Sequence, residues 1–235
     1  FEQTFLYNRN VKSITPLADW ITWRGLQQLN QDVRFSFDFS RFGAPIAAAL
    51  SAGKPIHLYQ HILSPHPPFT ITSEGEDTKA WLPYTRYIAT GNAIIYGQSA
   101  RRKAYAAGYL EKLRYTNQAL LAHIDHLVAA IPEPRVIIVQ SDHGGSAFYN
   151  HDALKSTCNR ERYGTLFAVQ AGPEASFIGD RPGGGYNTVN IYRDIFAAYF
   201  DLPTPPLPAN SYFAAWNALR RFEPVDLSAQ QACEP

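Results

Sequence analysis

Apolar residues in the middle of the chain recur at steps of three and four positions. They are Leu110, Leu113, Leu120, Leu121, Ile124, Leu127, Val128 and Ile131. This spacing is typical of an amphipathic helix with one face on a core. Pro132 and Pro134 follow directly and would end such a helix. The pattern therefore predicts a long helix over about 102–131.

Short apolar runs lie on either side of this helix and favour β-strands. One run is His57–Leu63, the other is Val136–Gln140, and a further probable strand covers Leu166–Val169. Strand, helix and strand in this order predict a βαβ crossover in an α/β fold. If the two strands are parallel neighbours, the residues that follow them share one edge of the sheet.

Two shorter helices are expected nearer the start. Thr15–Leu29 has a capping threonine and Pro16 in the first turn, with Trp20 and Trp23 on or near one face. A short helix is also expected over Pro45–Ala52. The aromatic face of the first helix must pack on another surface, which predicts a partner for it.

The residues after the second strand carry the strongest chemical signal. Ser141-Asp142-His143-Gly144-Gly145 offers a carboxylate and an imidazole side by side. One oxygen and one nitrogen ligand suit zinc or manganese better than calcium or magnesium. The alternative is a capped turn in which Asp142 accepts bonds from nearby backbone N–H groups. Both interpretations place Asp142 and His143 at the end of a buried strand.

The first strand runs into Ser64-Pro65-His66-Pro67-Pro68-Phe69. Three prolines around one histidine predict a stiff, extended loop. Held at a strand end, His66 could contact an anionic substrate or transfer a proton. The alternative is a proline-rich surface turn with an incidental histidine.

Two weaker candidates follow the Asp-His turn. His151 could reach the site from the next loop, or it could be a solvated loop histidine. Arg162, in the cluster Arg160-Glu161-Arg162, could bind an anionic substrate through both guanidinium nitrogens. The alternative for the cluster, which we favour here, is a surface ion-pair group that contributes little stability.

These motifs together resemble the sulfatase-like branch of the alkaline phosphatase superfamily, above all its membrane-anchored bacterial members. That branch includes sulfatases, lipoteichoic acid synthases and phosphoethanolamine transferases. The resemblance spans roughly residues 54–226, and only its two histidine-bearing motifs are specific. Its segments are His57–Phe69, Tyr109–Asn117, Val136–Gly144, Asn187–Arg193 and Pro208–Phe213.

The resemblance implies a mainly parallel, alkaline-phosphatase-like sheet flanked by helices and incomplete at its N-terminal side. Residues 1–235 would be the C-terminal part of one domain, with a lead-in over 1–53, an α/β core over 54–200 and an extended tail over 201–235. Asp142 and His143 match the family's metal ligands, and His66 matches a histidine beside the transferring group. The nucleophile and the first acidic ligand match nothing here and are expected on a missing N-terminal half.

The implied activity is metal-dependent hydrolysis or transfer of phosphate or sulfate esters through a covalent intermediate. Lipid- or glycan-linked substrates fit this branch, and both sulfuryl and phosphoryl transfer stay open. The family works outside the cytoplasm, in the bacterial periplasm or on the outer face of the inner membrane. Any membrane contact is expected only through segments outside this chain.

Composition adds limits rather than a further function. The net charge of +1 and the absence of a basic cluster beyond Arg101-Arg102-Lys103 argue against a nucleic-acid partner. Cys158 and Cys233 could pair, as suits an exported protein, or stay free. A noncatalytic fragment or pseudoenzyme that binds a metal ion, or a partner through the Trp20 and Trp23 face, remains the alternative to an enzyme.

Overall fold

The computed structural model describes residues 27–28, 30–78, 99–172, 188–227 and 233. Most of the helix expected over Thr15–Leu29, including Trp20 and Trp23, lies outside these residues, although 30–36 are helical. The remaining α-helices are α2 (Ser40–Ser51), α4 (Ser99–Ala130), α5 (Asn159–Tyr163) and α6 (Thr188–Phe200). The strands are β1 (Ile137–Gln140), β2 (Phe167–Gln170), β3 (Ser211–Ala214) and β4 (Phe222–Val225). Single 3₁₀ turns cover Leu154–Ser156 and Trp216–Ala218.

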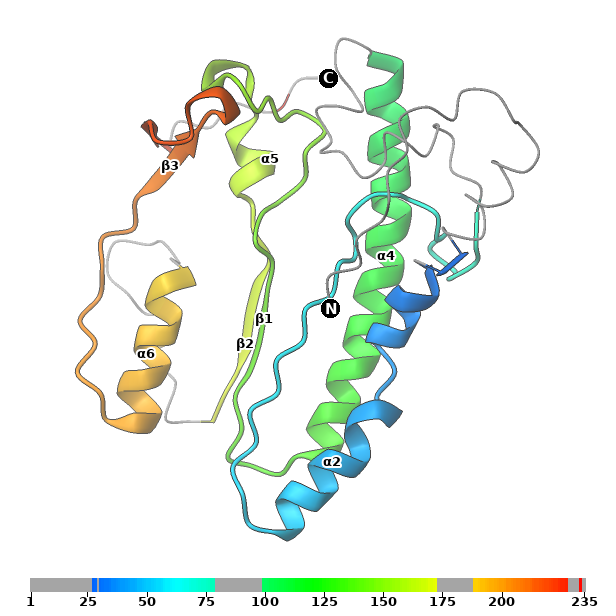
Figure 1. Cartoon of the computed structure of the whole chain (residues 1–235), viewed down its shortest axis with the longest axis vertical. Helices are drawn as coiled ribbons and strands as arrows, with labels where there is room; N and C mark the ends of the chain where they lie inside the picture. Colours follow the sequence, from blue (N-terminus) through cyan, green and yellow to red (C-terminus); the bar gives the residue numbers. More distant parts are fainter. Residues whose placement is uncertain (1–26, 29, 79–98, 173–187, 228–232, 234–235) are drawn as a thin grey trace.

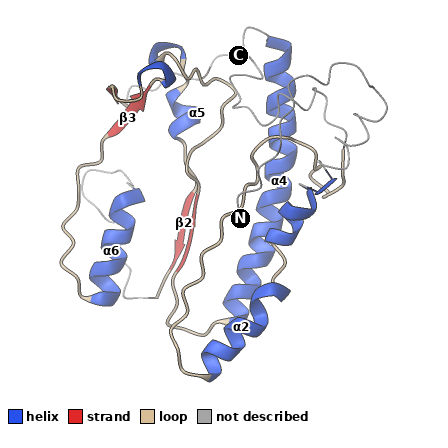
Figure 2. Ribbon diagram, viewed as in Figure 1, coloured by secondary structure: helices blue, strands red, loops and turns tan. Residues whose placement is uncertain are grey.

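The fold is mixed α/β, with two small antiparallel sheets. Strand β1 pairs with β2, so that Ile137 faces Gln170 and Gln140 faces Phe167. Strand β3 pairs with β4 in a separate hairpin of the tail, which was expected only to be extended. Figure 2 shows these strands as short ribbons among helices and long loops. The predicted helix over 102–131, the short helix near 45–52 and the strands at 136–140 and 166–169 are confirmed.

The strand predicted at His57–Leu63 does not form in the structure. Within the described residues, positions 55–62 make no backbone hydrogen bond, and a strand exists only when a neighbour pairs with it. Side chains in this segment nevertheless alternate, because 57, 59, 61 and 63 are exposed whereas 56, 58, 60 and 62 are partly buried. The segment has the form of a strand without a partner, so the parallel crossover is not present among the described residues.

Three layers are visible in Figure 1. Helices α2 and α4 lie on one side of the β1–β2 ribbon, and α6 lies on the other side. The segment 54–63 and β1 run in the same direction, from the lower to the upper end of this view. The residues that follow each of them therefore lie toward the same end of the molecule.

A small aromatic core lies at this upper end. Phe69, Tyr105 and Ala147 are buried together, and Tyr109 and Phe148 pack against them. The Phe69 ring meets the Tyr105 ring edge to face at 4.9 Å. Tyr105 belongs to α4, whereas Phe69 and Ala147 come from loops far apart in sequence. The cluster thus joins the chain after His66 to the chain after His143.

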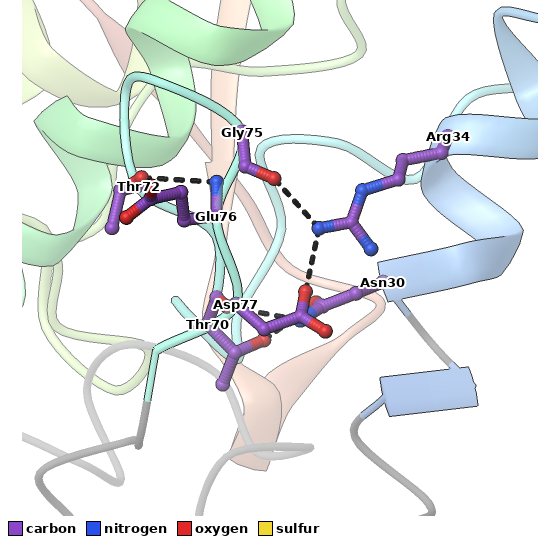
Figure 3. Close-up of polar contacts among 7 residues, drawn as sticks. All are labelled: Asn30, Arg34, Thr70, Thr72, Gly75, Glu76 and Asp77. Carbon is purple, nitrogen blue, oxygen red and sulfur yellow. Dashed lines mark hydrogen bonds and ion pairs between the residues drawn. The ribbon is translucent and has the colours of Figure 1, made fainter.

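A buried polar cluster fixes the turn over 70–78 to the helical stretch over 30–36 (Figure 3). Asn30 donates to the Thr70 carbonyl and to the Asp77 carboxylate, and accepts from the Thr70 hydroxyl. Arg34 donates to the Gly75 carbonyl and pairs with Asp77. Asn30 and Thr70 are almost fully buried, so these bonds satisfy groups that would otherwise be costly to bury.

The C-terminal tail returns to the region after β1. The backbone N–H of Trp216 donates to the His151 carbonyl, and the Tyr163 hydroxyl donates to the Tyr212 carbonyl. Cys158 and Cys233 form a disulfide, with their Cα atoms 5.5 Å apart. None of the described helices is both long enough and apolar enough to cross a membrane.

Candidate functional site

The Asp-His turn begins where the β1–β2 ladder ends. The Ser141 N–H donates to the Leu166 carbonyl at 3.0 Å, and the Leu166 N–H donates to the Ser141 hydroxyl at 2.8 Å. These bonds extend the pairing by one residue on each strand. The next two residues, Asp142 and His143, are thereby held at a fixed place beyond the strand.

Helix α5 holds the remainder of the turn through backbone bonds. The Glu161 carboxylate accepts from the N–H groups of Ala147 and Phe148, each at 2.7 Å. The Gly144 N–H donates to the Arg162 carbonyl at 2.8 Å. A Cβ at Gly144 would lie 2.0 Å from the Glu161 carbonyl oxygen, so only glycine permits this close approach.

The candidate ligands face solvent on this rigid backbone. The Asp142 side chain is 86% exposed and that of His143 is 39% exposed. Asp142 Oδ2 lies 3.4 Å from His143 Nε2, while Oδ1 accepts from the His143 N–H. Ligand atoms bound to one zinc ion at about 2.1 Å and near the tetrahedral angle lie about 3.4 Å apart. The turn-capping bond uses Oδ1 of Asp142, and Oδ2 lies at a distance from His143 Nε2 that two ligands of one zinc ion would have.

The other ring nitrogen of His143 has two contacts that call for opposite tautomers. A histidine that binds a metal through Nε2 carries its proton on Nδ1 and donates it to a carboxylate or carbonyl. His143 Nδ1 lies 2.8 Å from the Gly144 carbonyl oxygen, which is such an acceptor. Arg162 Nη1, which can only donate, lies 2.7 Å from the same Nδ1, so these two contacts do not fix which ring nitrogen carries the proton.

Arg162 lies beside His143 rather than in a surface ion-pair group. Its Nη1 is 2.7 Å from His143 Nδ1 and donates to the Ser146 hydroxyl at 2.8 Å. The guanidinium also stacks over the Tyr149 ring at 4.4 Å. No carboxylate among the described residues forms an ion pair with it. Its positive charge is thus available next to the candidate ligands.

His151 is buried, and the prediction of a solvated loop histidine is wrong. Only 7% of its surface is exposed, because the rings of Tyr149 and Trp216 pack against it at 4.5 and 4.8 Å. Among the described residues, neither ring nitrogen has a hydrogen-bond partner. Burial, with a further contribution from the Arg162 charge, lowers the pKa of His151, so the ring is neutral near pH 7.

The His66 loop is fixed on α4 but leaves the imidazole exposed. The His66 N–H donates to the Leu63 carbonyl at 3.0 Å. His66 Nδ1 lies 2.7 Å from the Pro67 carbonyl, which can only accept, so Nδ1 carries the proton and Nε2 faces outward. An outward, unprotonated Nε2 can accept a proton or a hydrogen bond from a ligand.

The structure joins the two histidine-bearing loops without joining their side chains. Phe69, three residues after His66, packs with Ala147, four residues after His143. Within the described residues, no hydrogen bond or ion pair connects His66 to Asp142 or His143. The site therefore consists of Asp142, His143 and Arg162 in contact, with His66 on an adjoining loop and His151 buried behind.

Two residues that fix these loops were not among the predicted site residues. Lys112 is buried on α4 and donates to backbone carbonyls of the His66 loop. Glu161 was assigned to a charged cluster but instead binds the backbone of the Asp-His turn. Lys112 is not one of the apolar positions from which the helix was predicted, and two of those, Leu110 and Leu121, are exposed. Neither Lys112 nor Glu161 therefore had a sequence signal for its role.

Across the part of the chain that the structure describes, no group of three or more histidine, cysteine, aspartate or glutamate side chains could hold a metal ion. Asp142 and His143 would offer two ligands at most, whereas a catalytic zinc site has three from the protein. Comparison with family models, with curated proteins and with solved structures finds no match for this chain.

Proposed function

We propose that this chain carries the metal- and anion-binding part of a hydrolase or transferase that acts on phosphate or sulfate esters. The observation that carries the proposal is the 3.4 Å separation between Asp142 Oδ2 and His143 Nε2 on an exposed turn with a fixed backbone. The resemblance of both loops to the sulfatase-like branch supports it. The same resemblance favours a larger parallel sheet, to which segment 54–63 would contribute a strand.

Each site residue has a role in this proposal. Asp142 and His143 hold a zinc or manganese ion, which would lower the pKa of the nucleophile and offset negative charge on the transferring group. Arg162 binds the anionic group of the ester next to them. His66 contacts the same group or protonates the leaving oxygen through Nε2. The resemblance assigns the nucleophile and the remaining metal ligands to a segment N-terminal to this one.

The disulfide supports a location outside the cytoplasm. Cys158–Cys233 is of the kind that persists in oxidising compartments, such as the bacterial periplasm or the outer face of the inner membrane. An ester linked to a lipid or glycan is a substrate class found there. The near-neutral charge of the chain supports a substrate of this kind over a nucleic acid.

The noncatalytic alternative has two observations in its favour. The described residues provide two metal ligands rather than three, as a pseudoenzyme that has lost its catalytic site would. Large exposed apolar side chains also suit a partner-binding protein; Tyr59, Leu63, Phe200, Trp216 and Phe222 are each at least 63% exposed. Metal binding at the Asp-His turn separates the enzyme, which requires it, from a purely partner-binding protein; a pseudoenzyme that still binds a metal differs from the enzyme in lacking activity.

Titration calorimetry with zinc and then with manganese tests the proposal. We expect one ion per chain, with binding lost in Asp142→Ala and in His143→Ala. Asp152→Ala and His57→Ala replace exposed residues of the same types away from the turn and should leave binding unchanged. Binding that survives in both site variants, or no binding by a folded chain, contradicts the metal role of this turn.

A second titration tests the anion site. Inorganic phosphate and sulfate should bind more tightly to the zinc-loaded chain than to the metal-free chain, because the ion and Arg162 then act together. Arg162→Met should remove most of this gain, whereas Arg160→Met, two residues earlier on α5 and exposed, should keep it. Equal loss in both variants contradicts a specific role for Arg162.

A further inference from the structure

The His66 loop lies along one face of α4. Gly108, Lys112 and Thr116 follow one another at four-residue steps and therefore share a face of the helix. The Thr116 hydroxyl bonds to the Ser64 hydroxyl at the start of the loop. A Cβ at Gly108 would lie 2.9 Å from the Cβ of Phe69, so the missing side chain admits the end of the loop. Lys112 lies between these two contacts.

Lys112 binds the middle of the loop with a buried ammonium group. Nζ donates to the His66 carbonyl at 2.7 Å and to the Pro68 carbonyl at 3.1 Å. The residue is only 4% exposed, and among the described residues no carboxylate pairs with it. A buried charge without a counter-ion is costly, which calls for a specific reason at this position.

The loop supplies such a reason. Proline lacks an N–H, so the sequence Pro65-His66-Pro67-Pro68 offers carbonyls but almost no donors for a regular backbone network. A donor from outside the loop must bind these carbonyls if the loop is to be buried on one side. Lys112 is that donor, and both of its acceptors lie within two residues of the His66 ring.

We propose that Lys112 is the positioning residue for His66: by binding the carbonyls of His66 and Pro68, it fixes the loop so that the imidazole donates from Nδ1 to Pro67 and presents Nε2 outward. This inference rests on the proposed function only for what Nε2 does, which is to contact the substrate or protonate its leaving oxygen. The geometric claim stands without a metal, a substrate or an activity.

The ring tautomer of His66 is the direct readout. In a free neutral imidazole the proton resides mainly on Nε2, whereas the bond to Pro67 requires it on Nδ1. The ¹⁵N chemical shifts of the two ring nitrogens distinguish these forms above neutral pH, and His66→Gln identifies the signals. In the unaltered chain we expect the Nδ1–H form.

Lys112→Met should shift these ring signals to the free-imidazole pattern, because the loop carbonyls lose their donor. Thr116→Val is the matched control: it removes the bond to Ser64 on the same helix face but leaves both Lys112 bonds, and His66 should keep its Nδ1–H form. A purely structural role for Lys112 would lower stability and leave the tautomer unchanged, which would overturn the proposal.

The unaltered chain gives a test that does not depend on a variant folding. The Lys112 ¹⁵Nζ signal should show slow proton exchange and hydrogen-bond couplings to the His66 and Pro68 carbonyl carbons. A fast-exchanging lysine without these couplings overturns the proposal. Loss of metal binding at Asp142 and His143 would contradict the proposed function but would leave every result in these tests unaffected.

Discussion

Two loops carry the candidate site, and each is fixed by a charged side chain that binds backbone rather than another charge. Lys112 donates to two carbonyls of the His66 loop. Glu161 accepts from two N–H groups of the Asp-His turn. The signs match the loops, because the proline-rich loop lacks donors whereas the turn after His143 presents free N–H groups.

The helices that carry Lys112 and Glu161 differ in length and stability. Lys112 is on a 32-residue helix that is long enough to be well formed. Glu161 is on a five-residue helix, which has little stability of its own. Helix α5 is preceded by Cys158, which is bonded to Cys233. The first loop therefore depends on a secondary structure element and the second depends on a covalent tether.

Breaking the tether gives the largest expected effect. The disulfide closes a loop with a sequence separation of 75 residues, so its loss should lower the free energy of unfolding by about 4 kcal/mol. We expect the double variant Cys158→Ser and Cys233→Ser to unfold at lower urea concentration and to lose amide protection at Ala147 and Phe148 first. The His66 amide, which donates to the Leu63 carbonyl, should keep its protection until global unfolding.

Equal early loss of protection in both loops would contradict this difference in support. Ser156→Ala and Ser211→Ala serve as controls. They replace small side chains near α5 and in the tail without breaking the disulfide, and neither should change the order in which the amides exchange.

The pH dependence of stability tests the other loop. Burial lowers the pKa of Lys112 from 10.5 to about 8, so from pH 8 to 10.5 the folded chain binds fewer protons than the unfolded chain. The free energy of unfolding contributed by this residue therefore rises with pH, by about 2 kcal/mol between pH 7.5 and 9.5. Lys112→Met should lack this rise in urea titrations.

Lys103→Met replaces an exposed lysine of the same helix and should retain the rise. Burial also raises the pKa values of Tyr105 and Tyr109, which are on α4 near Lys112, so measurements should stay below pH 9.5. Identical pH profiles for Lys112→Met and the unaltered chain would show that the ammonium is not buried in solution.

Removing the charge of Glu161 should have a smaller effect. Glu161→Gln keeps one carbonyl acceptor but leaves one N–H of Ala147 or Phe148 unbound, at a cost of about 1.5 kcal/mol. Zinc binding by Asp142 and His143 should weaken with it, since the turn loosens. Glu223→Gln, an exposed site on β4, is the control. If stability falls but zinc affinity is unchanged, the bonds from Glu161 to the turn backbone are not what places Asp142 and His143 for zinc binding.

The sequence predicted local elements better than their partners. The periodicity over 102–131 gave the extent of α4 to within three residues, because a helix satisfies its own backbone. The predicted apolar face was partly wrong, since Leu110 and Leu121 are exposed. The strand at 57–63 was predicted from the same kind of pattern and is absent, because a strand requires a neighbour that the pattern does not specify. The side chains of this segment alternate between exposed and partly buried, as the apolar pattern predicts, but no neighbouring strand pairs with it among the described residues.

Site residues divide in a similar way. Asp142 and His143 were predicted from residue type and position, whereas Arg162 was a weak candidate for which a surface ion-pair group was favoured; the structure brings all three into contact. His123 on α4 shows a contact that the sequence pattern does not specify. It is 2% exposed among phenylalanine rings and bonded to Gln60, a partner 63 residues away. Contacts across such distances depend on tertiary packing and have no local signature.

The smallest predicted effect tests whether the His66 loop is held on α4 by Lys112 alone or by several residues. Thr116→Val preserves shape but removes the hydroxyl that bonds Ser64 and the Lys112 carbonyl, so unfolding should become easier by about 1 kcal/mol. Thr165→Val, an exposed threonine before β2, should cost less. If Lys112 alone fixes the loop, exchange of the His66 amide should rise only through the global loss of stability. A selective rise at His66 would instead show that Ser64 and Thr116 share the anchoring.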